Sequence, residues 1–82
     1  MYETEDLYLA AALMVSGCPR ATVTKRGHRA TFAFPDSGAL RETVAEYYAG
    51  RLTVSALSFS EMLRTSKAAA MNVAREVTAV TP

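Results

Sequence analysis

The sequence contains one cysteine, Cys18, and one histidine, His28. One cysteine cannot form a disulfide within the chain or a zinc site built from several thiolates. One histidine excludes histidine-pair metal motifs, and a catalytic pair of a nucleophile and a histidine would have to use His28. The sequence also lacks a glycine-rich phosphate loop and a nucleophile elbow. We therefore expect a protein that is not an enzyme, has no evident small-molecule substrate and holds neither a metal nor another cofactor.

Long apolar runs are missing as well. The longest, Leu7–Val15, is far shorter than the ~20 residues that a membrane-spanning helix needs. Its length resembles that of the apolar part of a signal peptide, but Glu3, Glu5 and Asp6 precede it where such a signal carries positive charge. The sequence thus predicts no membrane association and a cytoplasmic protein.

The overall composition is that of one small globular domain. Of the 82 residues, 50% are hydrophobic and 21% are charged, and the net charge is only +1. A chain this short buries only ~60% of its unfolded surface, which leaves a core of modest size. No internal repeat or linker divides the chain. We expect a single domain over residues 1–82, with an ordered core over about residues 4–78.

The segment 29–34 (RATFAF) is the strongest strand signal in the chain. Ala30, Phe32 and Phe34 alternate with more polar or smaller residues, so that they share one face of a sheet. Residues 21–34 predict a β-hairpin with Gly27 in its turn. Between the turns Arg26-Gly27 and Gly27-His28 we favour the first, because the second sets Arg26 directly opposite Arg29.

Three helices and a further strand complete the prediction. The first helix begins at the N-cap Thr4 and ends at Gly17. The second helix spans residues 37–49, with Ser37 at its start and Gly50 at the C′ position that follows it. Residues 51–56 alternate as a short third strand. The last helix begins at a capping box of Ser58 and Glu61, with Leu57 and Met62 as a hydrophobic staple. The predicted fold is α+β, in the order α-β-β-α-β-α, with a small sheet and its hairpin packed against the helices.

Three segments resemble one known family. They are residues 4–11 (TEDLYLAA), 32–37 (FAFPDS) and 47–54 (YYAGRLTV). The chain resembles small bacterial and phage-borne proteins of unknown function that open with the pattern T-x-D-L-Y-L-A-A, and the likeness spans roughly residues 2–70. The resemblance implies a compact stand-alone module, often carried by a phage or another mobile element. It assigns no activity and no functional residue.

The first helix is apolar on all sides, which is unusual in so small a domain. A helix of this kind is normally buried all round. Because a small sheet and two further helices offer little surface to cover every side of it, we expect part of this helix to contact another chain. The expected interface residues are Leu7, Leu9, Leu13 and Met14. The alternative is that the other helices close around it within one chain.

Basic residues gather at the predicted hairpin. The cluster comprises Arg20, Lys25, Arg26, His28 and Arg29, and Arg64 and Lys67 on the last helix are candidates to extend it. Such a tip is typical of contact with a phosphate backbone, but charge also keeps edge strands soluble. Two functions therefore remain open. One is an accessory or interaction module that works as a subunit or homo-oligomer in a larger assembly. The other is a regulator that binds DNA or RNA.

Overall fold

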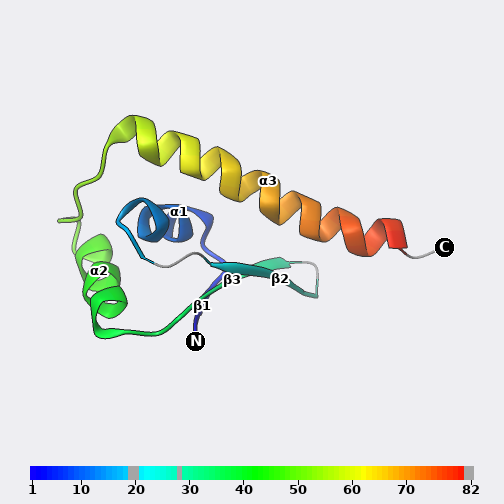
Figure 1. The fold of residues 1–82 in the computed structure, drawn as a ribbon, viewed down its shortest axis with the longest axis horizontal. Coiled ribbons are helices and arrows are strands. Elements are labelled where there is room, and N and C mark those ends of the chain that lie inside the picture. Colours follow the sequence, from blue (N-terminus) through cyan, green and yellow to red (C-terminus); the bar gives the residue numbers. More distant parts are fainter. Residues whose placement is uncertain (19–20, 28, 81–82) are drawn as a thin grey trace.

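The computed structural model describes residues 1–18, 21–27 and 29–80, with side chains up to Val73. The chain forms β1 (Tyr2–Thr4), α1 (Leu7–Val15), β2 (Thr22–Arg26), β3 (Arg29–Phe34), α2 (Gly38–Tyr48) and α3 (Ala56–Val80). The three strands make one antiparallel sheet in the order β1-β3-β2. Figure 1 shows α1 and α3 stacked over one face of this sheet, with α2 beside them. The predicted α+β class is confirmed.

The central strand β3 holds the core together as its pattern predicts. Phe32 and Phe34 are fully buried on the face that α1 and α3 cover. Phe32 lies opposite Val23 of β2 and Thr4 of β1, while Phe34 lies opposite Tyr2. Val23 therefore shares the buried face of the sheet with Phe32.

The third strand is not where the sequence predicts it. Residues 51–55 form no strand, although Leu52 and Val54 are half-buried in the expected alternation. The place beside β3 is taken by β1 at the start of the chain, so the order is β-α-β-β-α-α. Thr4 therefore ends a strand and is not a helix cap. Asp6 caps α1 instead, and its Oδ1 accepts hydrogen bonds from the backbone N–H of Tyr8 (3.0 Å) and Leu9 (3.2 Å).

The hairpin uses the less favoured of the two turns that the sequence predicts. Arg26 and Arg29 are directly paired, so Gly27 and not Arg26 begins the turn. Their repulsion is relieved by acids from the start of the chain. Arg26 forms an ion pair with Glu3 (3.0 Å between Nη2 and Oε1), and Arg29 with Glu5 (3.5 Å between Nη1 and Oε1). The prediction was wrong because these acids come from outside the hairpin.

Helix α1 is packed against α3, α2 and β1, and this position explains its composition. Leu9, Leu13 and the alanines at 10–12 are buried inside the single chain. The alanines add little bulk, so α3 and α2 can both pack against α1. Leu9 and Leu13 are therefore core residues, and their predicted place in an interface is wrong. Leu7 and Met14 are only half-buried.

Helix α2 follows its sequence signals closely. Ser37 is its N-cap, and the Ser37 Oγ accepts a hydrogen bond from the Leu40 backbone N–H at 3.1 Å. Gly50 follows the helix with a φ of +74°, a conformation that side chains other than glycine rarely adopt. Leu40 is buried in the core and Tyr47 packs against it. Both predicted ends of this helix are confirmed to within one residue.

Helix α3 begins three residues earlier than predicted. The first helical residue is Ala56, and the Ser55 Oγ accepts a hydrogen bond from the Ser58 backbone N–H at 3.3 Å. Ser58 therefore lies inside the first turn, and Leu57 is 70% exposed and forms no staple with Met62. The helix runs past the hairpin at its C-terminal end (Figure 1). None of the helices in the described part of the chain has the length and apolarity to cross a membrane.

Candidate binding cavity at an edge of the sheet

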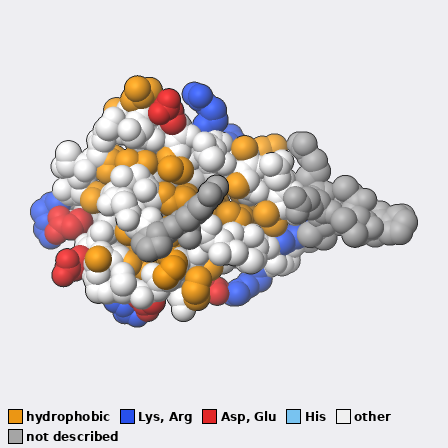
Figure 2. Space-filling view, in the orientation of Figure 1, with side chains coloured by type: hydrophobic (Ala, Val, Ile, Leu, Met, Phe, Trp, Pro, Cys, Tyr) orange, Lys and Arg blue, Asp and Glu red, His pale blue; other side chains and the backbone are white. Residues whose placement is uncertain are grey.

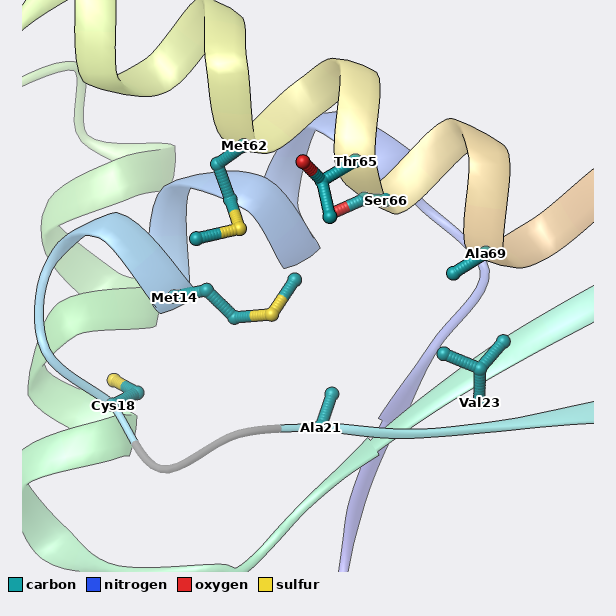
Figure 3. A pocket seen from close by; sticks show the side chains of 8 residues that line it. All are labelled: Met14, Cys18, Ala21, Val23, Met62, Thr65, Ser66 and Ala69. Atoms are coloured by element: carbon teal, nitrogen blue, oxygen red, sulfur yellow. The ribbon is translucent and has the colours of Figure 1, made fainter.

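A partly open cavity of about 390 Å³ lies between the end of α1, the start of β2 and the first half of α3. We call it the α3–β2 cavity. Its lining is mostly apolar and comes from all three segments (Figure 3): Met14, Cys18, Ala21, Val23, Met62, Thr65, Ser66 and Ala69. A cavity of this size accommodates a few side chains or a small ligand.

The side chains in this cavity are soft and adaptable. Met14 and Met62 approach it from α1 and α3, and the half-buried thiol of Cys18 lies at the loop end (Figure 3). Thioether side chains are flexible and polarizable, so they adjust to differently shaped apolar groups, and methionine is frequent at promiscuous binding surfaces. The lining is therefore better suited to apolar contacts than to chemistry on a substrate.

One polar group in the lining has no partner. Ser66 is only 2% exposed, and its Oγ forms no hydrogen bond with any described residue. A buried hydroxyl without a partner costs about 1–3 kcal/mol. Proteins often keep a locally unfavourable group of this kind at a functional site. Ser66 is therefore a destabilising polar group beside the cavity, with its oxygen closed off from solvent.

Replacing Ser66 with alanine should stabilise the fold. We expect Ser66→Ala to raise the free energy of unfolding by about 1–3 kcal/mol, because it removes the unsatisfied hydroxyl and alanine is also the better helix former. Urea melts of the two proteins measure this. Thr31→Val is a matched comparison outside the cavity, since Thr31 is 4% exposed and its Oγ1 also lacks a partner. A loss of stability in Ser66→Ala would show that the hydroxyl is already bonded in the free protein.

Sequence reasoning found only part of this cavity. Met14 was predicted as an interface residue and does line it, whereas Leu7 lies against the core elsewhere. Met62 was assigned to a helix staple and Cys18 to no role. No periodicity could find the site, because its lining residues are separated by up to 55 positions and meet only when α3 folds over β2.

The predicted basic cluster is neutralised only in part among the described residues. Two of its members, Arg26 and Arg29, form the ion pairs with Glu3 and Glu5 described above. Lys25, Arg64 and Lys67 form no ion pair with other described residues, and Arg64 and Lys67 are exposed on α3. Arg20 and His28 lie outside the described residues. The acids of β1 and its following loop thus offset the charge of Arg26 and Arg29, which is part of the charge that favoured a phosphate contact.

Nucleic-acid binding can be tested directly against this pairing. We expect weak binding or none when mixed DNA and RNA oligonucleotides are titrated in fluorescence anisotropy at ~0.15 M salt, because cations engaged in ion pairs release few counterions. A Glu3→Gln, Glu5→Gln variant should bind better. Tight binding by the unmodified chain would contradict this. In that case a plot of the logarithm of the binding constant against the logarithm of the salt concentration should fall with a slope of about 0.7–0.9 for each contacted phosphate. The triple variant Lys25→Glu, Arg26→Glu, Arg29→Glu should then abolish binding.

The exposed apolar side chains lie mainly elsewhere. Tyr8, Tyr48 and Leu57 are the clearest on α1, α2 and α3. Burial raises the pKa of Tyr47, and the nearby carboxylate of Asp6 raises it further. Figure 2 shows hydrophobic side chains spread over the centre of one face, with acidic and basic side chains mostly around its margin. This face has no strong charge of either sign.

Neither a metal site in the described residues nor a related protein indicates a function for the chain. Within the described residues, no three or more His, Cys, Asp or Glu side chains form a group that could hold a metal ion. No family model, curated protein or solved structure matches the chain. The family resemblance seen in the sequence stays a prediction.

Proposed function

We propose that the chain is a non-enzymatic interaction module that binds a protein partner by taking an apolar side chain into the α3–β2 cavity. In this role it is a subunit of a larger assembly in the cytoplasm. The sequence resemblance favours an assembly encoded by a phage or another mobile element. The observation that carries the proposal is the cavity itself. It is mostly apolar, open to the surface and lined by two flexible methionines.

A protein fits this site better than a nucleic acid does. The lining contributes no cation, so it offers nothing to a phosphate. The basic residues of the hairpin are partly engaged with Glu3 and Glu5. Apolar side chains gain about 25 cal/mol for each Å² that they bury, and the cavity provides that burial. The nucleic-acid regulator is therefore the less favoured alternative.

The proposal is tested by selection of binding peptides. A displayed library of random peptides is selected on the native chain and, in parallel, on Ala69→Phe, in which a large ring enters the cavity. The control is Ala68→Phe, because Ala68 is exposed one position away on the same helix. Thermal melts confirm that both variants are folded.

We expect peptides rich in apolar residues to be enriched on the native chain and on Ala68→Phe but not on Ala69→Phe. Equal enrichment on all three proteins would place binding outside the cavity. No enrichment on any of them would overturn the proposed function.

A further inference from the structure

The α3–β2 cavity lies directly beside a free edge of the sheet. β2 is the last strand in the order β1-β3-β2, so within the described chain it pairs with β3 alone. In an antiparallel pair, successive residues alternate between bonding to the neighbouring strand and pointing away from it. Arg26 and Arg29 close the hairpin around a two-residue turn, so they are a bonded pair. The backbone groups of Val23 and Lys25 therefore point outward from the sheet.

The side chain of Val23 links this edge to the cavity. Val23 lines the cavity and lies on the face that α3 covers, opposite Phe32. A new strand placed beside β2 would set one of its side chains next to Val23 on the same face. That side chain would enter the space bordered by Val23, Thr65 and Ala69. Backbone bonds and an apolar pocket are the two elements of recognition by strand addition.

The charges on β2 decide which strand fits. Lys25 and Arg26 are its only ionisable residues, and Lys25 lies on the same face as Val23, two residues further along. Lys25 has no ion pair with any described residue, whereas Arg26 is paired with Glu3. A second copy would bring the same cations to the edge, and lysine on an edge strand discourages such pairing. A strand with an acidic residue opposite Lys25 is complementary.

We propose that the partner is an extended segment of another protein that adds to β2 as a fourth strand, with an apolar residue opposite Val23 and an acidic residue opposite Lys25. This inference rests on the proposed function and names the chemistry of the partner. In an antiparallel arrangement the acidic residue precedes the apolar one by two positions. The residue between them faces away from α3.

The test uses synthetic peptides and the full chain. The probe is a fluorescent peptide with the core sequence Thr-Glu-Thr-Leu-Thr, in which Leu pairs with Val23 and Glu with Lys25. Two further peptides carry an N-methyl group, one on the Leu and one on the Thr that precedes it. Only the first modification removes an N–H that faces β2. Binding is measured by anisotropy and mapped by amide chemical shifts.

We expect the probe to bind and to shift the amide signals of Val23 and Lys25. Methylation of the Leu nitrogen should weaken binding by about tenfold or more, because a buried bond is lost, while methylation of the Thr nitrogen should have little effect. Lys25→Glu should weaken binding by about tenfold, and a peptide with Lys in place of Glu should restore it.

Three outcomes would overturn the inference. Equal effects of the two methyl groups would show that the cavity is occupied without strand addition, and the proposed function would survive. Absence of binding by the probe at ~1 mM would exclude this partner chemistry. A stable dimer in light scattering, with protected Val23 and Lys25 amides in the absence of peptide, would assign the edge to a second copy.

Discussion

Replacing Phe32 with alanine should lower the free energy of unfolding by about 3–5 kcal/mol. Phe32 is fully buried on the central strand and lies between Thr4 and Val23 of the two flanking strands. Its removal loses the transfer free energy of the ring and leaves a cavity, because the neighbouring side chains can relax only in part. The other large ring of the strand, Phe34, cannot fill both positions.

The consequence for so small a domain is near-complete loss of the folded state. We expect a total stability of about 5–8 kcal/mol, so Phe32→Ala should remain only marginally folded at room temperature. Urea melts followed by circular dichroism measure the change. Tyr48→Ala serves as a control. Tyr48 is 66% exposed, so its replacement should lower the free energy of unfolding only slightly. A loss of less than about 1 kcal/mol for Phe32→Ala would contradict the packing described here.

Replacing Leu13 with alanine should lower the free energy of unfolding by about 2–5 kcal/mol. Leu13 is fully buried in α1, within a core shared with Phe32 and Leu40. Because this burial occurs inside one chain, the loss should not depend on protein concentration. An interface residue would behave differently, since dilution would separate the chains and remove its contribution.

Denaturant melts of the native chain and of Leu13→Ala, repeated over a wide range of protein concentration, separate these cases. Light scattering at each concentration gives the oligomeric state. Leu57→Ala is the matched control on α3, because Leu57 is 70% exposed. If the denaturation midpoint of the native chain rises with protein concentration and that of Leu13→Ala does not, Leu13 contributes to an interface between chains.

The sequence determined the elements whose causes are local. Helix α2 begins at Ser37 and ends before Gly50 because a side-chain cap and a positive φ act within one turn of the chain. The core face of β3 follows from the alternation of Phe32 and Phe34, since successive side chains of a strand point to opposite faces. The apolar character of α1 correctly predicted a helix surrounded on most sides.

What covers α1 was decided only by the tertiary structure. The excess of apolar residues indicated that α1 needs partners, but not whether these come from the same chain. The structure supplies them from the sheet, α2 and α3. Leu9 and Leu13 are consequently core residues, and Met14 alone among the predicted interface residues lines the cavity.

Strand pairing and the hairpin turn were also settled by contacts between distant residues. Residues 51–56 were predicted as the third strand, but residues 2–4 take the place beside β3, and a few residues of alternation cannot reveal which segment pairs there. The ion pairs of Glu3 and Glu5 with Arg26 and Arg29 join residues more than 20 positions apart, and they permit a turn that local charge repulsion disfavoured. The α3–β2 cavity has the same origin, because α1, β2 and α3 contribute to it only after α3 has folded over the edge of the sheet.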